Sequence, residues 1–207
     1  MTDTKKLIQL LYSISDTIVE NAQFLTDLDA AIGDSDHGIN LARGFKKVET
    51  ELPALEDKTI DAVLKKTGMV LVSTVGGASG PLYGTAFMKA GAVVKGKSEI
   101  DINDFLAIMD AAIGGVQLRG KAVEGEKTML DAMIPANNAM KKAFDDGKDV
   151  HSVLQAGVEA ADKGVEYTKS IIATKGRASY LSERSIGHQD PGATSFTILL
   201  KTIANAY

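Results

Sequence analysis

Hydrophobic residues recur every three to four positions along almost the whole chain. One run is Leu7, Leu11, Ile14, Ile18 and Leu25, which would share one face of a helix. Similar runs follow within 60–71, 102–116 and 150–165. The alternating pattern of a half-buried strand, rich in β-branched and aromatic residues, is missing. The pattern therefore predicts an all-helical protein without a sheet.

Eight helices are expected from these runs. Their predicted ranges are 4–27, 36–51, 57–74, 80–95, 102–121, 129–146, 149–174 and 191–206. No linker, charge block or low-complexity tract divides the chain, so a single domain over residues 1–207 is expected. The longest predicted loop covers 175–190.

Glycine is concentrated in the loops before alternate helices. These segments are 32–38, 76–81, 120–128 and 187–192, whereas the other connections are plain. Helices joined by short connections are antiparallel neighbours. The second, fourth, sixth and eighth predicted helices would therefore begin at the same end. We expect an up-and-down bundle or α-barrel with its chemistry at that end.

Helix N-termini present unpaired backbone N–H groups and the positive end of the helix dipole, so they favour phosphate. Ser79 and Asp190 are expected N-caps, with Pro81 and Pro191 in the first turn. Any one of these loops could simply be a good cap. Four converging loops indicate an anion site.

Three carboxylates, Asp29, Asp34 and Asp36, lie in or beside the first of these loops. They would repel one another unless a cation lies between them. An EF-hand does not fit, because Ile39 stands where that loop needs Gly and Phe45 where it needs Glu. Mg²⁺ bound through carboxylates and substrate phosphates fits better. The alternative is a solvated acidic turn.

Composition excludes several classes of function. The chain has no Cys, which rules out disulfides, thiolate zinc sites and a cysteine nucleophile. The net charge is −4, which argues against nucleic acid as a partner, and neither a signal peptide nor a membrane span is evident. A cytoplasmic protein is expected. Residues 120–128 nearly copy a Walker A loop, but Glu126 replaces the Lys and no strand precedes it.

Several basic side chains fall in the same loops. Arg177 and Arg184 could each clamp a phosphate or form a surface ion pair. His37 is expected to cap its helix or contact phosphate, and His188 to order its loop. His151 starts an ordinary helix and is expected to be structural. No Ser-His-Asp relation can be argued from the spacing.

Together these loops resemble one family, the nucleotide-binding L subunit of dihydroxyacetone kinase. The matching segments are GDSDHG at 33–38, GGASGPLYG at 76–84, GEKTMLD at 125–131 and GRASYLSERSIGHQDPGAT at 176–194. Any one segment would be weak, but the combination is specific and extends over most of the chain. Ile39 and Ser182 depart from the family pattern, standing where a smaller residue and Gly are usual.

The resemblance implies an eight-helix antiparallel α-barrel that holds Mg-nucleotide, as ADP or ATP, at one rim. It assigns the metal, two Mg²⁺ ions, to Asp29, Asp34 and Asp36. It assigns a catalytic role to Arg177. The residues that it places around the nucleotide are His37, Gly38, Ile39, Asn40, Ala78, Ser79, Gly120, Met129, Arg177, Asp190, Pro191 and Gly192.

The resemblance also implies partners. A separate K subunit would hold dihydroxyacetone covalently on a His, and this chain would supply the γ-phosphoryl group. In the phosphoenolpyruvate-linked type, a phosphohistidine M subunit would rephosphorylate the retained ADP. Two alternatives stay open at this point: a kinase subunit that exchanges free ATP, and a binding module whose apolar interior holds a lipid or another hydrophobic ligand.

Overall fold

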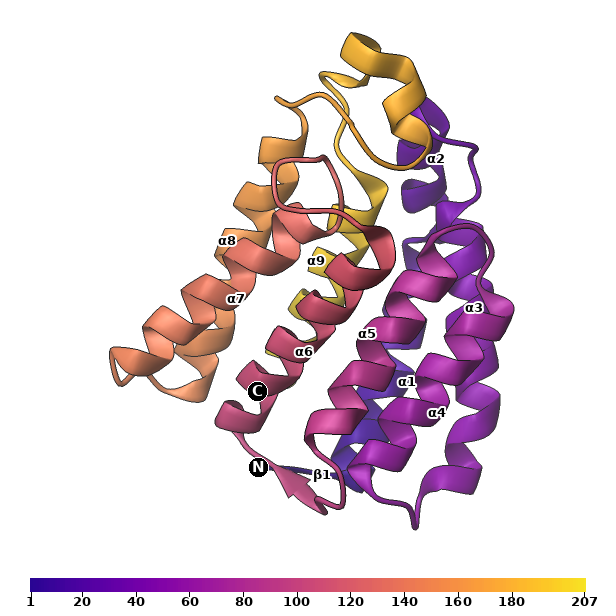
Figure 1. Cartoon of the computed structure of the whole chain (residues 1–207). Helices are drawn as coiled ribbons and strands as arrows, with labels where there is room; N and C mark the ends of the chain where they lie inside the picture. Colours follow the sequence, from indigo (N-terminus) through magenta and orange to yellow (C-terminus); the bar gives the residue numbers. More distant parts are fainter.

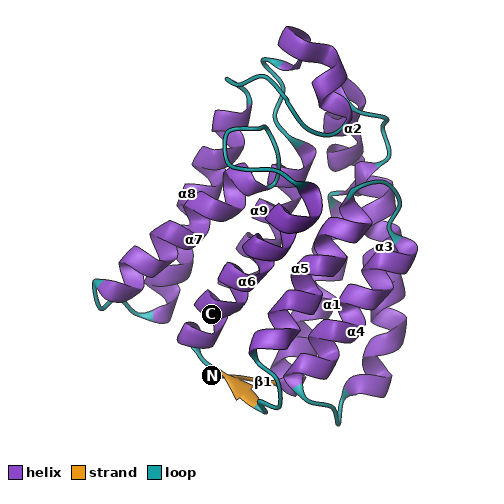
Figure 2. Cartoon of the chain, viewed as in Figure 1, coloured by secondary structure: helices purple, strands orange, loops and turns teal.

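Nine α-helices account for most of residues 1–207, all of which are described in this computed structural model (Figures 1 and 2). They are α1 (Thr4–Glu20), α2 (Ala22–Ile32), α3 (His37–Glu51), α4 (Ile60–Thr74), α5 (Ser79–Val93), α6 (Ile102–Gly120), α7 (Leu130–Asp145), α8 (Val150–Thr168) and α9 (Pro191–Ala204). Two 3-10 helices, η1 (Leu52–Leu55) and η2 (Arg177–Ser185), lie in connections. The prediction of an all-helical fold is confirmed.

A two-stranded antiparallel ribbon is the one departure from helix. Strands β1 (Thr2–Asp3) and β2 (Glu99–Ile100) pair with Thr2 opposite Ile100. The ribbon contradicts the expectation of no sheet, and it was not predictable because two residues are too few to show an alternating pattern.

The first predicted helix is divided at Asn21. The backbone N–H and the side-chain amide of Asn21 both donate to the carbonyl of Thr17, at 3.1 and 2.8 Å, which ends α1. Helix α2 then continues toward the same end of the molecule (Figure 1). The later helices therefore keep their expected directions, although the expected helix 4–27 becomes two.

Carboxylate caps begin several helices. Asp3, Asp149 and Asp190 accept backbone N–H groups at the starts of α1, α8 and α9, at 2.7–2.8 Å. Asp101 and Asp104 form a reciprocal capping box at the start of α6. These side chains satisfy N–H groups that a helix terminus leaves unpaired.

The helices follow a closed order of contacts. Each of α3 to α8 packs against the next helix along the chain, α1 packs against α3, and α9 returns to α1. Helices α7 and α8 approach so closely that a Cβ on Gly164 would lie 2.1 Å from the carbonyl oxygen of Asp131. Phe45, Leu71 and Leu200 are among the large side chains that are fully buried.

An apolar cavity of about 260 Å³ lies among the helices, and 25 of its 27 lining residues are hydrophobic. Thr2 and Tyr207, hydrogen-bonded to each other, are among its lining residues, so the two chain ends meet beside it. None of the helices combines the length and the hydropathy that crossing a bilayer requires.

Candidate functional site

The four glycine-rich loops line one cavity of about 760 Å³ at the end of the molecule where α2 terminates. The first residues of α3, α5, α7 and α9 contribute to its wall. The molecule therefore presents four helix N-termini to a shared space, as the loop pattern predicted. We call this cavity the rim site.

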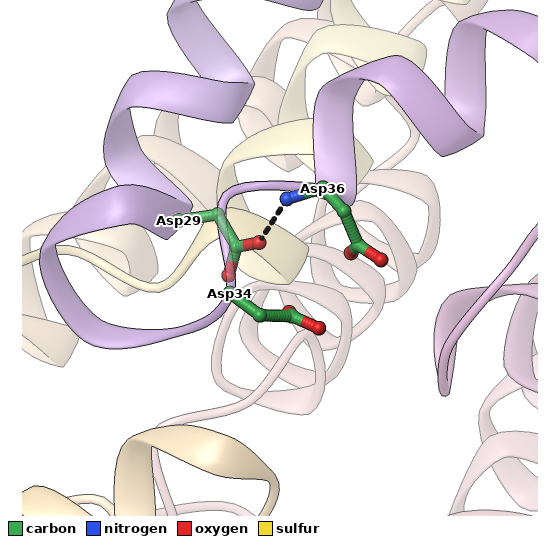
Figure 3. Close-up of side chains that lie close together, drawn as sticks. All are labelled: Asp29, Asp34 and Asp36. Carbon is green, nitrogen blue, oxygen red and sulfur yellow. Dashed lines mark hydrogen bonds between the residues drawn. The ribbon is translucent and has the colours of Figure 1, made fainter.

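Three carboxylates form an acidic group where α2 leads into α3 (Figure 3). Asp29 belongs to the last turn of α2, and Asp34 and Asp36 to the loop that follows. One oxygen from each of Asp29, Asp34 and Asp36 lies within 4.8 Å of the others. Asp29 Oδ2 accepts the backbone N–H of Asp36 at 2.9 Å and of His37 at 3.1 Å, so the loop itself fixes this carboxylate. A Cβ on Gly33 would lie 1.9 Å from Asp29 Oδ1, so this close approach requires glycine.

The electrostatics of the acidic group favour a bound cation. Burial, and next the negative charge of Asp34, raise the pKa of Asp36 above its ordinary value. A hydrogen bond from the Asn40 side chain and, to a smaller extent, the charge of Arg177 oppose this rise. The Arg177 guanidinium lies 2.8 Å from Asp34 Oδ2. Three converging hard oxygen donors fit Mg²⁺, and the donor set contains no sulfur or nitrogen ligand that would favour a softer metal.

His37 bridges three of the helix N-termini. Its Nδ1 lies 2.9 Å from Ser79 Oγ on α5, and its Nε2 lies 2.9 Å from Ser195 Oγ on α9. Ser195 Oγ donates to the carbonyl of Gly192 at 3.1 Å and is 2.7 Å from the Tyr83 hydroxyl. Each ring nitrogen of His37 thus has one serine partner, as a neutral imidazole requires, since it donates through one nitrogen and accepts through the other.

Burial lowers the pKa of His37 to about 4, so the imidazole is neutral near pH 7. His37 is thus not the helix cap, because Asp36 holds that position. Both of its ring nitrogens have serine partners, and its assignment to the nucleotide stays a prediction. Ser79 is likewise not the expected N-cap of α5. Ala78 holds that position, and the Ser79 hydroxyl faces His37 instead.

Asp190 lies where α9 begins. Its Oδ2 accepts the Ala193 N–H at 2.7 Å, as expected of an N-cap. Desolvation of the carboxyl raises the pKa of Asp190 to about 7, although the Ala193 hydrogen bond opposes that shift. Asp131 and Asp29 add negative charge nearby.

Most of the residues predicted from the sequence surround the rim site. Those in its wall are Asp29, Asp34, Asp36, His37, Ala78, Ser79, Gly120, Met129, Arg177, Asp190, Pro191 and Gly192. Three neighbours on α3 lie outside the wall. Gly38 is buried against the carbonyl of Ala22, Asn40 is buried, and the Ile39 side chain is 56% exposed. Their assignment to the nucleotide stays a prediction.

Other candidates occupy different places. Arg184 and His188 are exposed and lie outside the wall of the rim site, as does His151 on α8. The site is also lined by three residues that no sequence motif marks, Arg119, Lys127 and Tyr180. Lys127 stands in the segment 120–128 that resembles a Walker A loop, and no local pattern distinguishes its buried side chain from a surface lysine.

Comparison with protein families identifies a DAK2 domain at residues 31–205. The chain belongs to this family. The match covers Asp34 and Asp36, all four loops and helices α3 to α9, so the resemblance seen in the motifs is confirmed.

Close relatives share nearly the full length of the chain. The ADP-binding subunit DhaL of the PEP-dependent dihydroxyacetone kinase of Escherichia coli K12 is 41% identical over 201 residues, covering 97% of this chain and 96% of that protein. A corresponding subunit from Listeria innocua is 45% identical over 192 residues, covering 93% and 91%. This DAK2 chain is therefore a dihydroxyacetone kinase subunit by family, and its enzyme class is phosphotransferase.

Solved structures share its fold. The dihydroxyacetone kinase of C. freundii superposes with a TM-score of 0.74 at 23% identity, covering 97% of this chain and 34% of that one. The same kinase in complex with AMP-PNP and Mg²⁺ gives a TM-score of 0.72 at 24% identity, with 97% and 33% covered. At this identity the likeness establishes the helical fold.

Proposed function

We propose that this chain carries Mg-nucleotide in the rim site and passes its γ-phosphoryl group to dihydroxyacetone held on a separate K subunit. The ADP that remains is rephosphorylated in place by a phosphohistidine M subunit. The observation that carries the proposal is the convergence of four helix N-termini, three carboxylates and Arg177 on one cavity. The relatives named as ADP-binding subunits support it.

The residues have separate tasks in this proposal. Backbone N–H groups at the starts of α3, α5 and α9 bind phosphate oxygens, and the helix dipoles favour their negative charge. Arg177 approaches the transferring phosphoryl group and stabilises its charge. Mg²⁺ held in the rim site would supply charge neutralisation at the phosphates. Asp29, Asp34 and Asp36 hold it, and three carboxylates suit two ions better than one.

No protein nucleophile is needed for this chemistry. Phosphoryl transfer between bound nucleotide and a hydroxyl relies on positioning and charge stabilisation. The rim site offers both, and its one imidazole, on His37, is neutral and engaged on both nitrogens. The chain thus prepares the donor, while the acceptor comes from a partner.

A partner must dock near Arg177. The segment 163–188 contains five basic residues and two acidic ones. The basic residues are Lys163, Lys169, Lys175, Arg177 and Arg184. We propose that this excess attracts an acidic or phosphorylated partner, with association that weakens as salt rises.

The test of the nucleotide's role is exchange. Purified protein should contain ADP in native mass spectrometry, and the ADP should remain when labelled ATP is added in the absence of partners. Rapid replacement of ADP by ATP would instead favour the alternative, an ATP-exchanging kinase subunit.

The interior cavity supports a second candidate function. Its 25 hydrophobic lining residues and volume of about 260 Å³ suit an apolar chain or ring rather than nucleotide. Native mass spectrometry would reveal such a ligand as a mass distinct from ADP. Its absence in protein from several expression hosts would remove this candidate.

A further inference from the structure

One lysine is buried completely, unlike the rest of the chain's cations. The Lys127 residue is 2% exposed, and its backbone adopts a left-handed conformation with φ of 59°. Lysine is almost never fully buried unless its ammonium is paired. Burial lowers the pKa of Lys127, so hydrogen bonds and nearby carboxylates must stabilise its charge.

Three backbone carbonyls accept the Lys127 ammonium. They belong to Thr168, to His188 at 2.5 Å and to Ile171 at 3.4 Å. Thr168 is the last residue of α8, and His188 lies just before Asp190 at the start of α9. The ammonium therefore joins the two ends of the segment from Lys169 to Gln189, which we call the η2 loop.

This hydrogen bonding leaves no free donor for phosphate. An ammonium has three N–H groups, and each has a carbonyl partner here. The segment 120–128 resembles a Walker A loop, but its lysine does not take the phosphate-binding role of a Walker A lysine. The Lys127 side chain instead joins parts of the protein backbone to one another.

Neighbouring contacts close the η2 loop at the same place. The Gly187 N–H donates to the carbonyl of Lys169 at 2.8 Å, and the Asp190 N–H donates to Thr168 Oγ at 3.0 Å. Glu126, beside Lys127, accepts from the Thr174 hydroxyl at 3.1 Å. These bonds anchor both ends of the η2 loop. The middle of the loop contains Arg177, which forms an ion pair with Asp34.

We propose that Lys127 is a positioning residue that clasps the two ends of the η2 loop and thereby sets Arg177 over the acidic group. Lys127 acts through this loop and does not touch nucleotide. The clasp itself is argued from the contacts above. The effect of the clasp on phosphoryl transfer rests on the proposed function.

The first test is amide hydrogen exchange of the nucleotide-free protein. Lys127→Met removes the ammonium and keeps an unbranched aliphatic side chain of similar length. Because hydrogen bonds from charged donors are strong, amides in the η2 loop should exchange about 10- to 100-fold faster. Amides in α4 should keep wild-type protection. Lys201→Met is the matched control, since Lys201 also joins α9 to α8, through Asp162 at 2.7 Å, but lies on the surface.

Two results would overturn the clasp. Unchanged exchange in the η2 loop, combined with weaker ADP binding, would make Lys127 a phosphate ligand. Equal acceleration in every helix would make it a general contributor to stability. If Lys127→Met does not fold, Lys127→Gln retains an N–H donor without the charge and should give an intermediate acceleration confined to the same loop.

The second test is a double-mutant cycle on phosphoryl transfer. If Lys127 acts by placing Arg177, then Lys127→Met should slow transfer about tenfold or more in the wild type and much less in an Arg177→Ala background. Additive losses would refute the link to Arg177. Because the exchange experiment needs neither nucleotide nor partners, failure of the proposed function would leave its result intact.

Discussion

A single methyl group at Gly33 should disable the metal site while leaving the fold intact. In Gly33→Ala the new Cβ would start 1.9 Å from Asp29 Oδ1 and 2.8 Å from its Cγ. The carboxylate oxygen would have to move by about 1 Å to reach even a tight contact. Metal–ligand distances vary by only about 0.2 Å in well-formed sites. The movement would also break the hydrogen bonds from Asp36 and His37 that orient Asp29.

The expected size of the effect follows from linkage. Loss of a ligand's orientation should weaken Mg-ADP binding about 100-fold. At a concentration of about 100 times the wild-type Kd, Mg-ADP stabilises the wild type by about 2.7 kcal/mol, or about 5–11 °C in Tm. The variant would then be only half saturated and gain about 0.4 kcal/mol, or about 1–2 °C.

Thermal unfolding with and without Mg-ADP measures this difference. Gly114→Ala is the matched control, because a Cβ on Gly114 in α6 would meet nothing within 4 Å. Alanine suits a helix better than glycine by about 1 kcal/mol, so this variant should keep the full shift. A wild-type Mg-ADP shift in Gly33→Ala would refute the assignment of Asp29 to the metal.

Three further predictions concern the rim site. Asp34→Ala should lose most of the Mg-ADP shift in Tm because it removes a metal ligand, and calorimetric titration should show the weaker binding. Arg177→Ala and Arg177→Lys should both fold normally and transfer phosphoryl groups more slowly, since lysine keeps the charge but not the bidentate fork; wild-type transfer by either would make Arg177 a bystander. His37 has a folded pKa of about 4 against 6.5 when unfolded, so its stabilising contribution is lost as pH falls through that window, up to about 3 kcal/mol. Urea unfolding from pH 7 to 4 should therefore show a shallower decline for His37→Gln than for the wild type.

The fold was largely predictable because its signal is local. Apolar residues at helical spacing mark each helix, and short connections imply antiparallel neighbours. The prediction failed where tertiary contacts override that spacing. Helix α8 was expected to reach 174 but ends at Thr168, whose carbonyl accepts the Lys127 ammonium. The run of apolar residues from Leu7 to Leu25 predicts one continuous helix, but the side chain of Asn21 bonds to the Thr17 carbonyl where α1 ends.

The site was predictable in composition but not in its internal connections. In the sequence, clustered glycines indicate close backbone approach, and clustered aspartates indicate cation binding. Hydrogen bonds between distant residues carry no local signal, so the bridge from Ser79 through His37 to Ser195 was missed. Ser182 stands where glycine is usual in the family, and its φ of 52° with ψ of −125° supplies the reason.

Reconstitution of phosphoryl transfer tests the central claim most directly. The purified chain, given dihydroxyacetone and ATP, should produce no dihydroxyacetone phosphate. Adding the K subunit, the M subunit and a phosphoenolpyruvate-driven phosphohistidine relay should start turnover while ADP stays bound to this chain. Sustained turnover by the isolated chain would contradict the subunit role, and rapid turnover with free ATP and the K subunit alone would contradict the retained-nucleotide mechanism.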